Sequence, residues 1–292
     1  MKPIRSFLFV PGNRPSGIAK IPTFKADAVV LDLEDSVPFP LKPEARKTVA
    51  EAIPGLSAQG QRLFVRVNKS PYAYDWDDLN AVIQPGLEGL VMSKPNGPED
   101  VDMLTQIVSE IEWRKGMEVG AVSLIPTLET ARSAQFAYEI ACRERVATLA
   151  GASAKNGDVA RSIGFQWTQE GLETLYFKSQ VVLACRAAGK PYPLGGLWQD
   201  VHDLEGLRRS LKFNRQLGFS GEMVLHPSNV GPCNEAYTPG AEEVAYYEGM
   251  IKVFEEAQAQ GRAAVLYEGE HIDYAHVKTA RQILDLVKSF QA

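Results

Sequence analysis

The sequence predicts an α/β fold, a (β/α)₈ TIM barrel with a C-terminal helical extension, and three observations support it. Short apolar runs alternate with longer amphipathic stretches along the chain. The apolar runs are continuous, which is typical of strands buried on both faces, and their alternation with helices favours parallel pairing. About eight such strand–helix units fit into the 292 residues, which is the number that closes a barrel.

Each predicted strand is a short apolar run bounded by turn residues. Helical spacing of apolar residues between the strands predicts helices, among them residues 42–52, 98–108 and 172–183. A doubly wound open sheet is the alternative fold, but Pro11-Gly-Asn-Arg14 is not the Gly-rich phosphate fingerprint that such a fold carries after its first strand. In chain order, the strands are expected at residues 7–10, 28–33, 63–67, 89–92, 121–125, 146–149, 194–197 and 223–225.

Two parts of the chain are expected, a catalytic barrel over residues 1–235 and a helical extension or cap over residues 236–292. The composition is that of an ordinary globular protein, with 45% hydrophobic residues, 23% charged residues and a net charge of -5. This mild acidity argues against a nucleic-acid partner. Three cysteines without a CxxC pair indicate reduced thiols, and the chain has neither a bilayer-spanning run nor a signal peptide. We therefore expect a cytoplasmic protein without a membrane partner.

Polar residues end almost every predicted strand. The loops that follow the strands of such a barrel gather at one face, where active sites lie. Charges at so many strand ends therefore indicate a catalytic face. The polar and charged residues at these strand ends are Asn13, Arg14, Asp32, Glu34, Asp35, Arg66, Asn68, Lys94, Glu129, Asp158, Asp200 and His226.

Glu129 and Asp158 are the candidate metal ligands. Each is expected where a buried strand gives way to a loop, and two carboxylates on neighbouring strand ends suit a hard cation such as Mg²⁺ that keeps water or substrate oxygens as its other ligands. The alternative for either acid alone is a helix cap or a surface ion pair.

Several motifs in order make the chain resemble the citrate lyase β-subunit-like CoA ester lyases of the HpcH/HpaI aldolase superfamily. The resemblance covers nearly the whole chain. The motifs include Arg5-Ser-Phe-Leu-Phe-Val-Pro-Gly-Asn-Arg14, Ala28-Val-Val-Leu-Asp-Leu-Glu-Asp-Ser36, Val65-Arg-Val-Asn68, Ser93-Lys-Pro95, Pro126-Thr-Leu-Glu129 and His226-Pro227.

The resemblance implies a (β/α)₈ barrel, a Mg²⁺ site for which Mn²⁺ can substitute, and a homotrimer or hexamer. Glu129 and Asp158 match the family's metal ligands, although the loop before Asp158 is longer here than is usual. Arg66 matches the catalytic arginine, whose planar fork suits a carboxylate or an enolate, and a structural ion pair with Glu34 or Asp35 is the alternative. Glu34 belongs to an acid cluster that lines the metal site or acts as a base.

A CoA thioester also needs cations or backbone amides for its phosphates. Asn13, Arg14, Lys20, Lys42 and Arg46 follow the first two strands and are the candidates for this nucleotide end. Lys42 and Arg46 also fit an ordinary solvated helix face, so both interpretations stay open.

Asp273 is the last candidate. In the family a matching Ile-Asp segment comes from a neighbouring subunit, and its Asp exchanges a proton at the acyl carbon. Asp273 fits a plain helix N-cap equally well.

The resemblance implies an enzyme, a carbon–carbon lyase that cleaves or forms the bond between a 2-oxo acid and an acyl-CoA, with malyl-, citramalyl- or citryl-CoA as the type of substrate. Three alternatives stay open: a CoA-independent class II pyruvate aldolase, a thioesterase or two-step malate-forming enzyme, and a non-catalytic subunit that binds a ligand or an acyl carrier. The aldolases commonly use a histidine early in the chain, and none precedes His202. Intact Arg66, Glu129 and Asp158 argue against a non-catalytic subunit.

Overall fold

The computed structural model describes residues 1–291 and divides into two compact units. The larger unit is Ile4–Glu235, and the smaller one comprises Met1–Pro3 and the chain from Ala236 onward. No helix within the described residues is long and apolar enough to cross a membrane.

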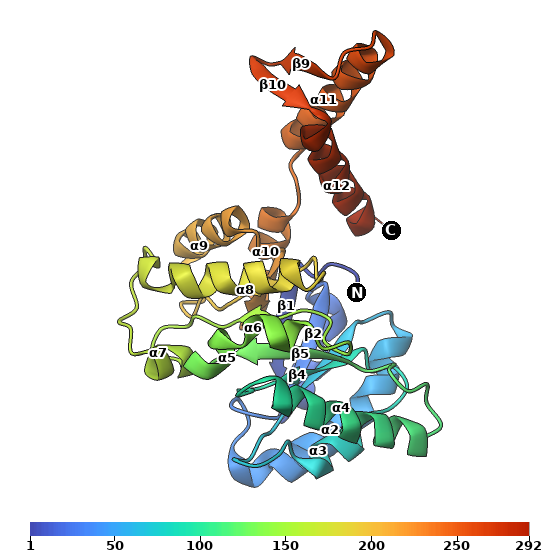
Figure 1. Ribbon diagram of the computed structural model, residues 1–292. Coiled ribbons are helices and arrows are strands. Elements are labelled where there is room, and N and C mark those ends of the chain that lie inside the picture. The colour runs from blue at the N-terminus through green and yellow to red at the C-terminus, as the bar shows by residue number, and fades with distance from the viewer. Residues whose placement is uncertain (292) are drawn as a thin grey trace. The chain divides into compact units, whose positions relative to one another are not determined.

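The larger unit is a closed barrel of parallel strands, seen at the centre of the lower part of Figure 1, and it confirms the predicted fold class. Each strand pairs with the next, and β1 closes the ring by pairing with β8. The strands are β1 (Ser6–Pro11), β2 (Ala28–Asp32), β3 (Leu63–Val67), β4 (Gly89–Met92), β5 (Ser123–Leu128), β6 (Ala150–Gly151), β7 (Leu194–Gly195) and β8 (Gly221–Val224).

Helices connect the strands and cover the outside of the barrel. The α-helices of this unit are α1 (Pro15–Ile18), α2 (Lys42–Ala58), α3 (Trp76–Val82), α4 (Pro98–Arg114), α5 (Ala131–Gln135), α6 (Ala137–Ala141), α7 (Asp158–Ile163), α8 (Leu175–Ala187) and α9 (Leu204–Leu217), and α10 (Val230–Tyr237) runs across the boundary between the units. Short 3₁₀ helices are η1 (Ile21–Thr23), η2 (Phe39–Leu41), η3 (Leu172–Thr174) and η4 (Pro227–Asn229).

The sixth strand differs most from the prediction. It was expected at residues 146–149, but regular pairing with β5 and β7 occurs at Ala150–Gly151. Val146 forms only an isolated parallel bridge to Leu124, and the three residues between it and Ala150 interrupt the ladder. The apolar run therefore lies beside β5 as expected, with backbone hydrogen bonds that join Leu124 to Arg145 and Ala147, but the regular ladder begins only after the run, at Ala150.

Apolar side chains from all parts of the barrel fill its interior. Phe7 and Phe64 are completely buried and pack edge to face, with their ring centroids 5.0 Å apart. Burying one such ring stabilises the fold by about 1.5 to 3 kcal/mol. The interior is therefore a packed core, and it leaves the carboxyl ends of the strands as a rigid frame for polar side chains.

The smaller unit has its own core. It contains α11 (Ala241–Ala259), the antiparallel pair β9 (Ala264–Tyr267) and β10 (Glu270–Asp273), and α12 (Tyr274–Gln291). Buried Met250 and Phe254 on α11 pack with Ile272, Val277 and Ala280. A hairpin between two helices thus forms where the sequence predicts a helical extension.

Candidate active site

A small cavity lies at the carboxyl ends of the barrel strands. Its volume is about 120 Å³. It is lined by apolar side chains from β1, β8 and the residues just after β7 and β8, and by polar groups from β2, β3, β5 and the residues that follow β2 and β5. The lining residues are Phe9, Pro11, Asp32, Ser36, Arg66, Thr127, Glu129, Leu197, Met223 and Leu225. Three of the charged residues at predicted strand ends therefore meet in one place.

An ion pair between Asp32 and Arg66 forms the floor of this site. Residues 32 and 66 are register partners on β2 and β3, so their side chains emerge side by side. Arg66 donates from Nε to Asp32 Oδ1 and from Nη2 to Oδ2, both at 2.7 Å, which is the two-pronged geometry of a strong arginine–carboxylate pair. The backbone amides of Glu34 and Ser36 also donate to the Asp32 carboxylate.

These contacts keep both partners charged. Burial alone would raise the pKa of Asp32, but the hydrogen bonds and positive charge of Arg66 outweigh it and hold that pKa below its usual value. Burial likewise favours loss of the Arg66 proton, and the carboxylate of Asp32 more than compensates, so the pKa of Arg66 is raised. Asp32 accepts hydrogen bonds from two guanidinium nitrogens, and this fixes the plane of the guanidinium group and the position of its third nitrogen, Nη1.

Lys94 lies between the remaining carboxylates. Its Nζ is 2.5 Å from Glu34 Oε1, 2.8 Å from Asp35 Oδ2 and 3.3 Å from Asp158 Oδ2. Lys94 follows β4 and has a φ of +48°, a left-handed conformation that non-glycine residues rarely adopt and that is found more often at functional sites. The sequence analysis placed Lys94 at a strand end without giving it a role. The motif Ser93-Lys-Pro95 marked it, but its acid partners come from two distant segments, the loop after β2 and the first turn of α7.

Glu34 links the arginine to this lysine. Its Oε2 lies 3.1 Å from Nη1 of Arg66 in an ion pair that is not aligned as a hydrogen bond, and this buried oxygen has no hydrogen-bond donor among residues 1–291. Burial raises the pKa of Glu34 even though Arg66 and Lys94 both lower it. The neighbouring Asp35 is more exposed. Burial raises its pKa, but the hydrogen bond and charge of Lys94, together with smaller contributions from Glu34 and Arg66, outweigh burial and lower the pKa. Of this acid pair, Glu34 is therefore the better proton acceptor.

Glu129 is a buried carboxylate without a hydrogen-bond partner in the described part of the chain. It follows β5 and is only 7% exposed. Burial raises its pKa to about 8, although Arg66 and Lys94 lower it, and the negative charges of Glu34 and Asp158 contribute to the rise. The buried hydroxyl of Thr127 faces the same cavity and also has no hydrogen-bond partner within residues 1–291. The Glu129 carboxylate and the Thr127 hydroxyl therefore face one cavity, and such oxygen donors suit a hard divalent cation.

Asp158 lies at the other side of Lys94. The sequence analysis expected it in a loop, but it is the first residue of α7, a short helix that begins after Gly157. Its carboxylate contacts the guanidinium of Arg161 one turn later as well as Lys94. No group of three or more His, Cys, Asp or Glu side chains within residues 1–291 is arranged to hold a metal. Asp158 does not line the cavity that holds Glu129, and its charge is balanced by Lys94 and Arg161.

The five candidates for a nucleotide end separate into two groups. Arg46 is held by the carboxylates of Asp75 and Asp78 at 3.2 and 2.8 Å, and Lys42 donates to Asn68 and to the carbonyl of Glu34. These two are ion-paired or turned toward the acid cluster, so neither lies on a solvated helix face. The others, in the loop after β1, are Arg14 and Lys20, both exposed, and Asn13, whose buried Oδ1 has no hydrogen-bond partner among residues 1–291.

Asp273 belongs to the smaller unit and caps α12. Its Oδ1 accepts hydrogen bonds from the backbone amide of Ala275 at 2.9 Å and from the His276 side chain at 2.7 Å. The hydrogen bond from His276 is the main reason why the pKa of Asp273 lies below its usual value. Within the chain this carboxylate has the N-cap role that the sequence analysis left open as the alternative.

A closed parallel barrel with a buried arginine–acid cluster at the carboxyl ends of its strands has the architecture of a TIM-barrel enzyme. Residues 5–227 match the family described as HpcH/HpaI aldolase/citrate lyase. The chain belongs to this family, whose enzymes are carbon–carbon lyases.

Full-length relatives place the chain more closely. It is 28% identical to the citrate lyase subunit beta of Haemophilus influenzae, over 99% of this chain and 98% of that protein. It is 29% identical to the mitochondrial citramalyl-CoA lyase of Rattus norvegicus, over 99% of this chain and 87% of that protein. A solved citrate lyase beta subunit from Mycobacterium tuberculosis, complexed with oxaloacetate and magnesium, is 26% identical, covers 81% of this chain and 98% of its own, and superposes with a TM-score of 0.67. These relatives place the chain among the CoA ester lyases of the family.

Proposed function

We propose that this protein is a Mg²⁺-dependent CoA ester lyase that cleaves or forms the carbon–carbon bond between a 2-oxo acid and an acyl-CoA. Thioesters of the malyl-, citramalyl- or citryl-CoA type are the proposed substrates. The single observation that carries the proposal is the buried Glu129 carboxylate, which has no hydrogen-bond partner within residues 1–291 and lies in one cavity with Arg66. Burial raises the pKa of this carboxyl group to about 8 despite the nearby positive charges of Arg66 and Lys94, and a bound cation would stabilise its charged form, so we propose that the cavity binds a cation or a cation–substrate complex.

Glu129 and Asp158 are the residues proposed to hold the metal. Their carboxylates are close enough for Asp158 to raise the pKa of Glu129, and the Thr127 hydroxyl offers a further oxygen in the cavity. Bound Mg²⁺ supplies Lewis-acid polarisation of the oxygens at the reacting carbon of the substrate. The relative solved with oxaloacetate and magnesium supports this assignment, and Mn²⁺ is the expected substitute.

Arg66 is proposed to stabilise the negative charge that develops as the bond opens. Asp32 binds two of its nitrogens, so the remaining Nη1 edge is fixed in position before substrate arrives. A fixed, always charged donor in a buried site costs little reorganisation during the reaction. Asp32 acts through Arg66 and is a positioning residue.

Proton transfer is assigned to two acids. In the cleavage direction the hydroxyl of the substrate loses its proton, the carbon–carbon bond breaks, a carbonyl forms on the 2-oxo acid, and the electron pair passes to the thioester as an enolate. Glu34 is proposed to accept the hydroxyl proton, because burial raises its pKa and one of its oxygens has no donor. Asp273 of a neighbouring subunit is proposed to return a proton to the enolate carbon, in a homotrimer or hexamer. The coenzyme phosphates are assigned to Arg14 and Lys20, with Asn13 beside them.

The test is turnover of a panel of thioesters. The protein is incubated with Mg²⁺ and malyl-, citramalyl-, 3-hydroxy-3-methylglutaryl- or citryl-CoA. Release of a free oxo acid is followed, which is a 2-oxo acid for the malyl, citramalyl and citryl thioesters and the 3-oxo acid acetoacetate for the 3-hydroxy-3-methylglutaryl thioester. Turnover of one member that EDTA abolishes supports the proposal. If none of the four thioesters is cleaved but the protein condenses pyruvate with an aldehyde or cleaves the product, the function is that of a class II aldolase. If a thioester is hydrolysed without cleavage of the carbon–carbon bond, the function is that of a thioesterase.

A further inference from the structure

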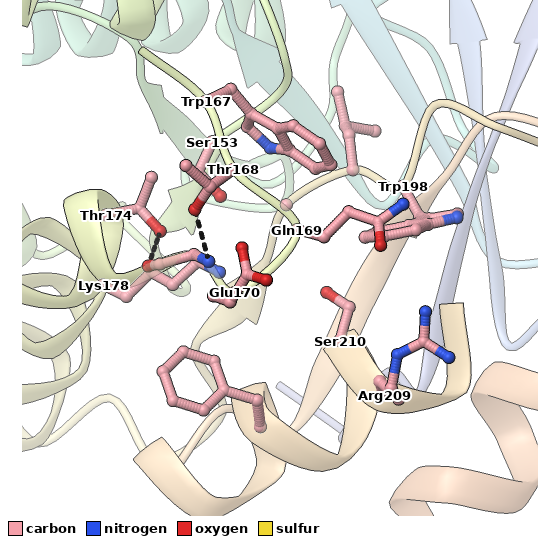
Figure 2. Close-up of a pocket in the computed structure, with 14 residues that line it drawn as sticks. Ser153, Trp167, Thr168, Gln169, Glu170, Thr174, Lys178, Trp198, Arg209 and Ser210 are labelled. Carbon is pink, nitrogen blue, oxygen red and sulfur yellow. Dashed lines mark hydrogen bonds between the residues drawn. The ribbon is translucent and has the colours of Figure 1, made fainter. Parts of the chain in front are cut away.

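A second and larger cavity lies beside the proposed active site. Its volume is about 310 Å³, which is within the range of small-molecule sites, and it is formed by the segments after β6 and β7 together with α8 and α9 (Figure 2). Leu197 lines both cavities, so the two adjoin at the same face of the barrel. None of the residues proposed for catalysis or metal binding lines the larger one.

Lys178 is the unusual residue of this cavity. It lies on α8 and is only 6% exposed, yet its ammonium forms no ion pair or hydrogen bond within residues 1–291. The nearest favourable feature is the ring of Phe213, whose centroid is 5.4 Å from Nζ. Burial lowers the pKa of Lys178, and the negative charges of Glu222 and Glu173 only partly oppose it. Placing an ammonium there without a partner is costly, which is a common property of binding sites and a rare one of structural lysines.

The other lining groups define what would fit. Arg209 on α9 also forms no ion pair or hydrogen bond in the described chain, and Figure 2 shows it across the cavity from Lys178. The walls between them are aromatic: Trp167 and Trp198 have ring centroids 5.8 Å apart, and Phe213 lies beneath Lys178. Glu170, which is exposed, is the one carboxylate among the described lining residues, and it does not approach either cation within 4 Å.

We infer that this cavity binds a small organic carboxylate, with its anionic group on Lys178, its carbon skeleton against Trp167, Trp198 and Phe213, and a second acidic group, where present, toward Arg209. A carboxylate carries one charge, which matches the single buried ammonium. Phosphate would instead require several converging donors, such as an arginine fork or a row of backbone amides. The carboxylate can be a free acid or part of a substrate that extends past Leu197.

Tryptophan fluorescence can test the proposal without any catalytic activity. In a Trp76→Phe/Trp113→Phe background the emission comes from Trp167 and Trp198 alone. Succinate, benzoate and inorganic phosphate are titrated in the absence of metal. We expect saturable changes with succinate and benzoate. Lys178→Met should weaken binding by at least about tenfold, since a hydrogen bond to a charged group is lost.

Matched variants separate charge from structure. Lys212→Met removes the charge of an exposed lysine on the same helix as Arg209 and should change nothing, while Glu170→Gln should tighten binding because it removes the opposing charge. Lys178→Met should melt no lower than the parent protein, because it removes an uncompensated buried charge and nearly preserves volume.

Competition identifies the source of the carboxylate. If a thioester substrate displaces succinate, the cavity holds part of the substrate. If the thioester and succinate bind at the same time, the cavity holds a separate acid. Either result supports a carboxylate site. Three results would overturn the inference: no saturable change with either carboxylate, Lys178→Met binding as well as the parent, or phosphate binding more tightly than both acids.

Discussion

Replacing Glu129 by glutamine should stabilise the metal-free protein at alkaline pH and have little effect at acidic pH. The cause is the burial of a carboxyl group whose pKa is raised from 4.5 to about 8. When the pKa of a carboxyl group is higher in the folded state than in the unfolded state, the group does not destabilise the fold at a pH below its unfolded-state pKa. The cost grows as the pH rises from 4.5 to about 8 and is complete above that. This shift corresponds to about 5 kcal/mol at 25 °C, which is a large part of the stability of an ordinary domain.

The assay is urea unfolding in EDTA at pH 5 and at pH 8.5, with the free energy of unfolding compared between the parent and Glu129→Gln. We expect the variant to gain several kcal/mol relative to the parent at pH 8.5 and much less at pH 5. Added Mg²⁺ should recover stability for the parent only, because the cation replaces the missing counter-charge. Glu118→Gln is the matched control, since Glu118 is exposed. Equal gains for Glu129→Gln at both pH values would refute the reasoning.

Three further predictions concern the residues around Glu129. Arg66→Lys should reduce kcat/KM nearly as much as Arg66→Ala, because an ammonium cannot reproduce the fork that Asp32 holds, and a lysine variant near the parent rate would contradict this role. Asp32→Asn should cost about 3 to 5 kcal/mol in urea unfolding, because it leaves the Arg66 charge buried without its main partner, and a loss below 1 kcal/mol would argue against that pairing. Asp273→Asn and Arg66→Ala should each be nearly inactive alone, while co-expressed mixed oligomers should recover activity because some interfaces then combine an intact barrel with an intact Asp273. Proven mixed oligomers that stay inactive would place Asp273 outside a shared site.

The sequence predicted the barrel because its strands carry a strong local pattern. The first five strands and the eighth were found within a few residues of their predicted positions. The sixth and seventh strands are only two residues long. The seventh begins at its predicted residue, Leu194, and ends earlier than predicted, whereas the sixth begins after its predicted apolar run. The predicted strand ends also brought Asp32 and Arg66 together, although the sequence analysis named Glu34 and Asp35 as the partners of Arg66. Parallel register, which sequence does not reveal, made Asp32 the main partner.

Side-chain partners that only the tertiary structure brings together were harder to predict from the sequence. Arg46 resembled a solvated helix residue, but α3 brings the Asp75 and Asp78 carboxylates against it. The role of Lys94 depends on acids from two distant segments, the loop after β2 and the start of α7. Asp158 was expected in a loop but lies in the first turn of α7. The burial of Lys178 had no sequence signal, because the residue lies in a segment with ordinary helical spacing.

Mn²⁺ binding measured by electron paramagnetic resonance tests the central claim most directly. Glu129 and Asp158 are proposed to hold the metal, so the parent protein and Glu118→Gln should bind Mn²⁺ saturably, and Mg²⁺ should compete for the same site. Glu129→Gln and Asp158→Asn should lose this binding while keeping the far-UV circular dichroism of the folded barrel. Parent-like Mn²⁺ binding by the folded Glu129→Gln protein would contradict the account.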